Sequence, residues 1–124
     1  MVGQSVITLD TLSISQIRDL LHKAAYIDAN RKRVAHTCDG RVLATLFYEP
    51  STRTRLSFET AMLRLGGQVI GFAGAQLASV SKGESIADTL KTVSNYVDVV
   101  AIRHPKEGAA LVASRACLLY TSDA

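Results

Sequence analysis

Most of the predicted fold follows from one stretch, RVLATLFYEPSTRTRLSFETAMLRLGGQVIGF (residues 41–72). It begins with an apolar run over 41–48 that lacks strict alternation, which is typical of a strand covered on both faces. A helical pattern of apolar side chains follows, and Gly66-Gly67 end it as glycines often end helices. A second strand-like run covers 68–72. Strand, helix and strand in this order predict one βαβ unit.

The segments on either side continue this alternation. Residues 12–30 have an apolar face at helical spacing, and Ser13 and Gln16 have the spacing of a capping box. After the central unit the chain predicts a crossover helix, a third strand and the start of a further helix, over residues 84–97, 98–104 and 106–116. We therefore expect an α/β fold in which a parallel sheet is flanked by helices on both faces.

Composition limits the class of protein. The chain has 124 residues, of which 48% are hydrophobic and 20% charged, so we expect one globular domain. The net charge is +3, but the basic residues are dispersed, so we expect no nucleic-acid binding. No apolar run reaches the roughly 18 residues of a membrane span. With no signal-like N-terminus and no cysteine pattern for disulfides or metal, we expect a cytoplasmic protein without membrane attachment.

Three polar segments follow the ends of the three predicted strands. They are residues 49–55, residues 73–84 and the pair Arg103-His104. Ligands of parallel α/β folds bind at the carboxyl ends of the strands. We therefore expect the functional site where these three segments meet.

The sequence Ser-Thr-Arg-Thr-Arg at 51–55 predicts a site for an anion. A helix that starts here offers unpaired N–H groups and a partial positive charge. Ser51, Thr52 and Thr54 add hydroxyl groups, and Arg53 adds a planar guanidinium that fits phosphate. The alternative is an ordinary helix cap with exposed arginines. Two positive charges at the positive end of a helix are unfavourable without an anion, so we favour a phosphate or a phosphate ester.

Three motifs, in this order, resemble the catalytic chains of aspartate carbamoyltransferases. They are FYEPSTRTRLSFETAMLRLGG (47–67), SKGESIADT (81–89) and RHP (103–105). STRTR is shared with ornithine carbamoyltransferases, whereas SKGE and RHP favour the aspartate enzymes. The resemblance covers about residues 7–116, so it implies an incomplete carbamoyl-phosphate-binding domain over 1–116. The remaining residues, 117–124, form a tail unrelated to the family pattern.

The resemblance implies a role for each matching residue. Carbamoyl phosphate would be bound by Ser51, Thr52, Arg53, Thr54 and Arg103. Of these, Arg53, Thr54 and Arg103 would be catalytic, with Thr54 and Arg103 polarising the carbamoyl carbonyl.

Further implied roles concern other parts of a larger enzyme. Lys82, with Ser79 as the accompanying serine, would reach the aspartate site of a neighbouring subunit in a homotrimer. Glu49 would take part in domain closure. The resemblance also leaves room for a regulatory chain or pathway partner.

The implied reaction transfers the carbamoyl group of carbamoyl phosphate to the amine of L-aspartate. It gives N-carbamoyl-L-aspartate and phosphate in de novo pyrimidine biosynthesis, and it needs neither a metal ion nor an organic cofactor. The family's His-Pro-Thr-Gln motif and its aspartate-binding domain do not occur in these 124 residues, so we expect the isolated chain to be inactive. Two alternatives stay open: a non-catalytic anion-binding module, and a carbamoyltransferase for another acceptor such as ornithine.

Overall fold

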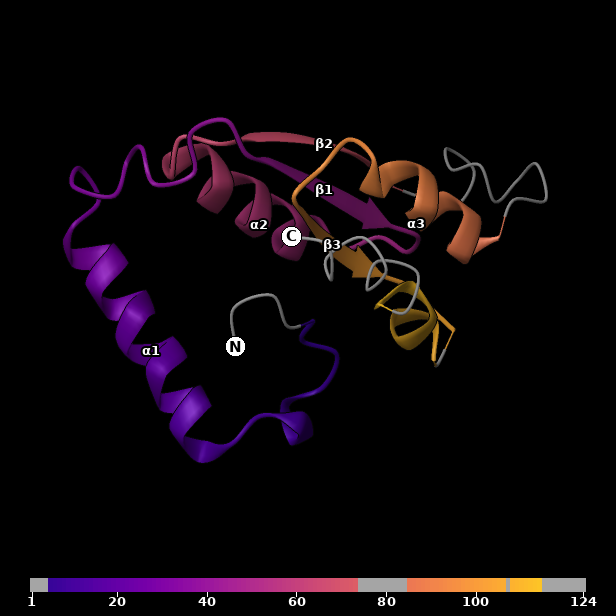
Figure 1. Ribbon diagram of the computed structural model, residues 1–124, viewed down its shortest axis with the longest axis horizontal. Helices are drawn as coiled ribbons and strands as arrows, with labels where there is room; N and C mark the ends of the chain where they lie inside the picture. Colours follow the sequence, from indigo (N-terminus) through magenta and orange to yellow (C-terminus); the bar gives the residue numbers. More distant parts are fainter. Residues whose placement is uncertain (1–4, 74–84, 107, 115–124) are drawn as a thin grey trace.

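The computed structural model describes residues 5–73, 85–106 and 108–114, and it contains the predicted order of helices and strands (Figure 1). The elements are η1 (Leu9–Thr11), α1 (Ile14–Ala29), β1 (Val42–Phe47), α2 (Thr52–Arg64), β2 (Gln68–Ala73), α3 (Ile86–Ser94) and β3 (Val99–Arg103). Residues 109–114 are helical as well. Each predicted element is therefore confirmed, with ends that differ by a few residues.

The three strands form a parallel sheet in the order β2-β1-β3. Thr45, in the middle of β1, pairs with Gly71 on one side and with Ala101 on the other. The chain passes from β1 to β2 on one side and then crosses back over β1 to reach β3. This change of direction lies between β1 and β3, where ligands bind in folds of this kind.

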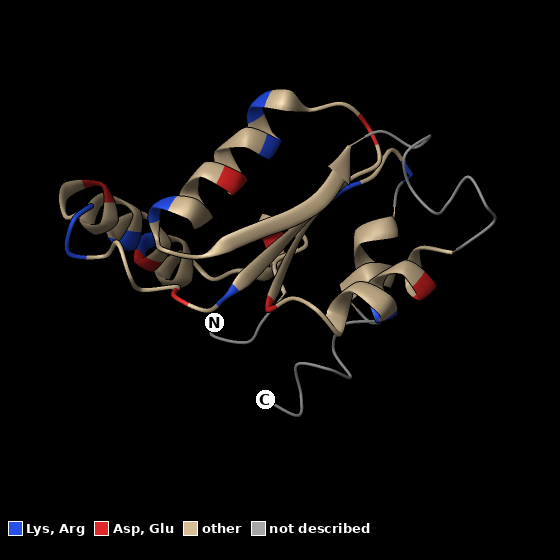
Figure 2. Cartoon of the chain, turned by 90° about the horizontal axis from the view of Figure 1, so that it is seen from above, with Lys and Arg blue, Asp and Glu red and all other residues tan. Residues whose placement is uncertain are grey.

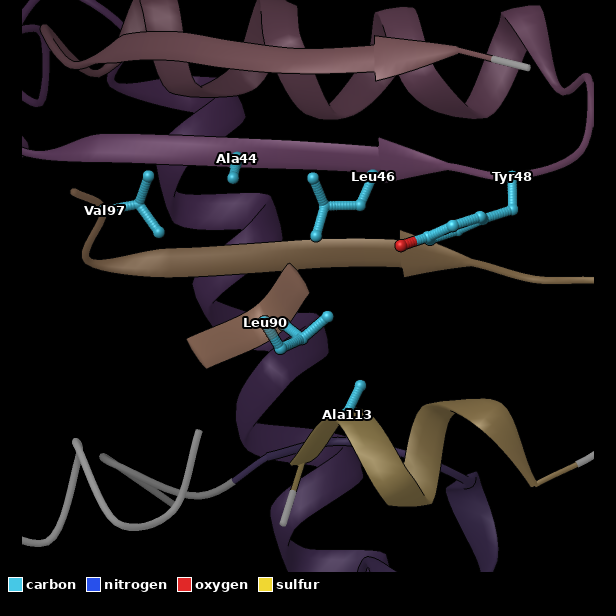
Figure 3. Close-up of a cluster of buried hydrophobic side chains, with 6 residues drawn as sticks. All are labelled: Ala44, Leu46, Tyr48, Leu90, Val97 and Ala113. Carbon is cyan, nitrogen blue, oxygen red and sulfur yellow. The ribbon is translucent and has the colours of Figure 1, made fainter. Parts of the chain in front are cut away.

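Helices cover both faces of the sheet, which confirms the predicted fold class. Figure 2 shows the strands between α2 on one side and α3 with the last helical segment on the other. On the α3 side, alternate residues of β1 join a core that also takes side chains from α3, its following loop and the last helix (Figure 3): Ala44, Leu46, Tyr48, Leu90, Val97 and Ala113. On the α2 side, Thr45 of β1 donates a hydrogen bond to Glu59 of α2. β1 is buried from Leu43 to Phe47, as expected for a strand covered on both faces.

Helix α1 forms as predicted but stands apart from the sheet (Figure 1). Its capping box is present, because the Ser13 hydroxyl accepts from the Gln16 amide and the Gln16 side chain accepts from the Ser13 amide. No residue of α1 is buried, and Ile14 and Leu21 are 72% and 66% exposed. Helical spacing predicts which side chains share a face, but it does not say what covers that face.

None of the helices in the described residues is both long enough and apolar enough to cross a membrane.

Candidate anion-binding site

The predicted site residues of β1 and β3 meet at the carboxyl ends of these strands. The ladder continues past β1, because the Tyr48 amide donates to the Arg103 carbonyl at 2.8 Å. The Arg103 guanidinium then donates from Nε to Glu49 Oε1 at 2.9 Å and from an Nη atom to the Ser51 hydroxyl at 3.0 Å. Residues about 50 positions apart in the sequence are thus joined by direct hydrogen bonds.

Helix α2 starts at Thr52 with its first amide groups uncapped by a side chain. Ser51 is the N-cap residue, yet its hydroxyl makes no capping hydrogen bond and is held by Arg103 instead. The Ser51 carbonyl accepts the first helical bond, from the Arg55 amide at 3.0 Å. The alternative of an ordinary Ser cap is therefore not supported, and the N–H groups of the first turn are available to a ligand.

The two arginines of the motif have different surroundings. Arg55 lies 3.4 Å from Glu59, measured from Nε to Oε2, so its charge already has a partner within the helix. Arg53 is exposed, and its guanidinium makes no hydrogen bond or ion pair with any residue that the structure describes. The expectation that both arginines need an anion is therefore wrong for Arg55. For Arg53, whose charge lies at the positive end of the helix dipole, it stays a prediction.

The hydroxyls of the first turn complete the set of donors. Thr52 and Thr54 are exposed like Arg53, so all three side chains are open to solvent. Thr54 and Arg103 also line one end of a cleft of about 920 Å³ that runs along α2 and β3. Two guanidinium groups, three hydroxyls and a helix N-terminus can surround a small anion with charge-assisted hydrogen bonds.

His104 follows Arg103 but adds no positive charge to this site at neutral pH. Burial lowers its pKa below the ordinary value, the charge of Lys106 lowers it further, and only Glu49 acts in the opposite direction. Its Nδ1 accepts a hydrogen bond from the Lys106 amide at 3.0 Å, and its ring packs against Tyr48 with 4.7 Å between centroids. The neutral ring therefore serves as a packing group at the exit of β3.

Two predicted segments lie outside the described residues. They are the tail at 117–124 and residues 74–84 of the polar segment predicted after the second strand, which includes Ser79 and Lys82. Among residues 5–73, 85–106 and 108–114, no group of three or more His, Cys, Asp or Glu side chains is placed to hold a metal ion.

The sequence analysis did not identify Glu59 as part of the site. Glu59 touches both Arg55 and the buried Thr45. The spacing of four residues between Arg55 and Glu59 is a signal for an ion pair on a helix. The contact with Thr45 had no such signal, because it depends on how α2 lies over β1.

A family model matches nearly the whole chain. The family model described as aspartate/ornithine carbamoyltransferase, carbamoyl-P binding domain, matches residues 4–119. The chain belongs to this family. The resemblance found in the three sequence motifs is thereby confirmed.

Close relatives within the carbamoyltransferase family are aspartate carbamoyltransferase catalytic subunits. The one from Bifidobacterium longum subsp. infantis is 90% identical over 116 residues, which is 94% of this chain and 36% of the relative. The one from Clostridium novyi is 58% identical over 113 residues, 91% of this chain and 37% of the relative. The chain thus spans about a third of the length of the curated relatives it matches.

Solved structures of carbamoyltransferases have the same fold. The catalytic subunit of M. jannaschii aspartate transcarbamoylase superposes with a TM-score of 0.82 at 47% identity, covering 89% of this chain and 38% of that one. Aspartate transcarbamoylase from Trypanosoma cruzi, in complex with carbamoyl aspartate and phosphate, has a TM-score of 0.84 at 36% identity. That match covers 94% of this chain and 36% of the other.

Proposed function

We propose that this chain is the carbamoyl-phosphate-binding part of an aspartate carbamoyltransferase catalytic chain. The whole enzyme transfers the carbamoyl group of carbamoyl phosphate to L-aspartate, giving N-carbamoyl-L-aspartate and phosphate in de novo pyrimidine biosynthesis. The observation that carries the proposal is the meeting of Arg103, Ser51 and the uncapped start of α2 at one edge of the sheet. The names of the relatives support the choice of reaction.

In this proposal the first turn of α2 binds the phosphate group. Ser51, Thr52, Arg53 and Thr54 supply hydroxyls, a guanidinium and backbone N–H groups around its oxygens. Thr54 and Arg103 lie at the side facing the carbamoyl group and polarise its carbonyl. The backbone N–H groups at the start of α2 are oriented toward the ligand before it binds, which is how electrostatic stabilisation is most effective.

The reaction needs no nucleophilic side chain. The aspartate amine attacks the carbamoyl carbon, and a tetrahedral intermediate forms with negative charge on the carbonyl oxygen. The C–O bond to phosphate then breaks, and the amine proton leaves with the phosphate. Positioning and charge stabilisation account for the catalysis, so neither a metal ion nor an organic cofactor takes part in the proposed mechanism.

Glu49 has a switching role in the proposal. Its carboxylate lies 2.9 Å from Arg103 and therefore competes with an anion for the same guanidinium. In the complete enzyme Glu49 turns to the second domain as the domains close, which releases Arg103 to the carbamoyl group.

The remaining proposals concern the assembled enzyme. Lys82 and Ser79 act in the site of a neighbouring subunit of a cytoplasmic homotrimer, which a regulatory chain or pathway partner can join. We assign the carbamoyl-phosphate-binding domain to residues 1–116, and the family model extends its match to residue 119.

A chimera tests the proposed reaction. Residues 1–116 are joined to the rest of the Bifidobacterium relative, and the purified enzyme is supplied with carbamoyl phosphate and either L-aspartate or L-ornithine. We expect carbamoyl-aspartate to form and ornithine to be ignored. Arg103→Ala should lower kcat by roughly a hundredfold or more, the usual loss when one group that stabilises the oxyanion is removed.

The control variant is Arg31→Ala, since Arg31 pairs with Asp28 far from the site at the end of α1. Failure of the folded chimera to form carbamoyl-aspartate would contradict the proposed reaction. Full activity of Arg103→Ala would contradict the assignment of the site.

A further inference from the structure

Glu59 connects α2 to the central strand behind the anion site. Its Oε2 accepts a hydrogen bond from the Thr45 hydroxyl at 2.8 Å and lies 3.4 Å from Nε of Arg55. Thr45 is 1% exposed in the middle of β1, and the Glu59 side chain is 23% exposed. A single carboxylate oxygen therefore joins a buried hydroxyl of the sheet to a guanidinium near the start of the helix.

The neighbouring strand leaves room for this contact. Gly71 of β2 pairs with Thr45 in the sheet. A Cβ atom at position 71 would meet the Thr45 carbonyl oxygen first, and it would also lie 2.5 Å from Thr45 Oγ1. The absence of a side chain at Gly71 therefore leaves both the backbone and the hydroxyl of Thr45 undisturbed.

Apolar packing holds the first half of α2 only weakly. Met62, near the other end, is the one buried residue of the helix. Leu56 and Phe58 are both 48% exposed. The hydroxyl of Ser51 gives the helix no capping bond. Two polar contacts therefore connect α2 to the sheet: Ser51 accepts from Arg103 at the start of the helix, and Glu59 accepts from Thr45 near its middle.

We propose that Glu59 is a positioning residue for the anion site. By binding Thr45 it sets where the donors of residues 51–54 lie relative to Arg103. By pairing with Arg55 it keeps that guanidinium directed along the helix and away from the anion. The inference rests on the proposed function, in which these donors bind the phosphate group. Misplacement of such groups by about 1 Å can weaken their action up to a hundredfold.

The test measures binding of inorganic phosphate and carbamoyl phosphate to the 124-residue chain, by calorimetry and by amide NMR shifts of residues 51–54. Thr45→Val keeps the side-chain shape and removes the hydroxyl, and Thr45→Ser restores a hydroxyl. We expect roughly tenfold weaker phosphate binding for Thr45→Val and near wild-type binding for Thr45→Ser. Glu59→Gln, which keeps the side-chain shape and removes the pair with Arg55, should also weaken binding.

Leu90→Ala controls for a general loss of stability. Leu90 is 1% exposed in the core on the opposite face of the sheet, so its truncation lowers Tm without removing a donor of the anion site. Phosphate affinity of the folded protein should stay within about twofold of wild type, since this variant leaves the donors in place. The ligand-free amide shifts of residues 52–54 should move in Thr45→Val and stay in Leu90→Ala.

The possible results distinguish a failure of the positioning role from a failure of the proposed function. If the wild type binds phosphate at 51–54 and both Thr45→Val and Glu59→Gln bind it equally well, the positioning role is overturned and the proposed function stands. If the folded wild type binds neither phosphate nor carbamoyl phosphate at this turn, both are overturned.

Discussion

Arg103 is shared between a carboxylate and a hydroxyl, and this sharing governs how strongly it can hold an anion. Its Nε donates to Glu49 and one Nη atom donates to Ser51. Both side chains of the ion pair are partly exposed, so the pair itself contributes little to stability. Its main effect is that the Glu49 carboxylate partly neutralises the positive charge of Arg103 at the end of β3.

Glu49→Gln should therefore tighten phosphate binding to the isolated chain. Loss of the carboxylate removes a competitor for Arg103 and a repulsive charge beside the anion. We expect an affinity about threefold to fivefold higher at low salt, the range for a partly exposed charge. Calorimetry gives the affinity.

A matched control for this variant is Asp98→Asn. Asp98 also pairs with an arginine, Arg41, but at the opposite end of the strands. Asp98→Asn changes the net charge by the same amount as Glu49→Gln. Because Asp98 lies far from the anion site, phosphate affinity should stay near that of wild type. If Glu49→Gln and Asp98→Asn raise phosphate affinity equally, the effect comes from overall charge, and competition between Glu49 and the anion for Arg103 is excluded as its cause.

His104 makes stability depend on pH. Its pKa in the folded chain is lowered from the ordinary 6.5, first by burial and then by Lys106. The unfolded chain thus binds the proton more readily, and stability rises with pH through this range. The contribution is complete above about pH 6.5 and is lost as the pH falls below it.

Thermal unfolding of wild type and His104→Gln at pH 7.5 and 5.5 checks this effect. The fall in Tm between the two pH values should be smaller in the variant, because one proton-linked group is gone. The two proteins differ only at residue 104, so the comparison isolates the effect of this side chain. An equal fall in both would show that His104 ionises alike in the folded and unfolded chain.

Among the elements, the end of α2 has a strict backbone requirement. Gly66 has φ of +91°, and a Cβ there would meet the side chain of Asp39 and the Ala35 carbonyl. Gly66→Ala should lower the free energy of unfolding by roughly 2–4 kcal/mol, from the positive φ and the overpacking together.

Gly40→Ala isolates the first of these two causes. Gly40 has φ of +78°, but nothing lies within 4 Å of its Cβ position. We expect a loss of only about 1 kcal/mol in denaturant unfolding. If both variants lower the free energy of unfolding equally, the neighbours of position 66, Asp39 and Ala35, can move aside for the added Cβ atom without an energetic cost.

The elements themselves could be predicted from local patterns, whereas most contacts of the site could not. The unbroken apolar run of β1 and the glycines after α2 carry signals within a few residues, so the sheet and its crossover helix were predictable. The turn at 51–54 was predictable too, because its donors are consecutive. The pairs Arg103–Glu49 and Thr45–Glu59 join residues that only the folded sheet brings together.

At the scale of the whole molecule, apolar surface remains open. Leu9, Ile14 and Leu21 are each more than 60% exposed, and the cleft of about 920 Å³ along α2 and β3 is lined mostly by apolar residues. Exposed apolar surface of this kind favours association. The exposure of the apolar face of α1 was not predictable, since helical periodicity carries no information about what covers a face.

We expect the 124-residue chain to self-associate as its concentration rises, and Leu21→Glu to reduce this association. A charge in the apolar face of α1 raises the cost of burying that face. Sedimentation velocity gives the distribution of species. Lys23→Glu, an exposed polar position on the same helix, controls for charge. Sedimentation of Leu21→Glu like that of wild type would exclude α1 from the association.

The central claim is that the first turn of α2 binds carbamoyl phosphate, and calorimetry at low salt with Arg53→Ala tests it most directly. Arg64→Ala, at the other end of the same helix, is the matched control. We expect wild type and Arg64→Ala to bind alike and Arg53→Ala to bind roughly tenfold to a hundredfold more weakly, the range for one charge-assisted hydrogen-bonding group. Equal affinity of folded wild type and folded Arg53→Ala would contradict the claim.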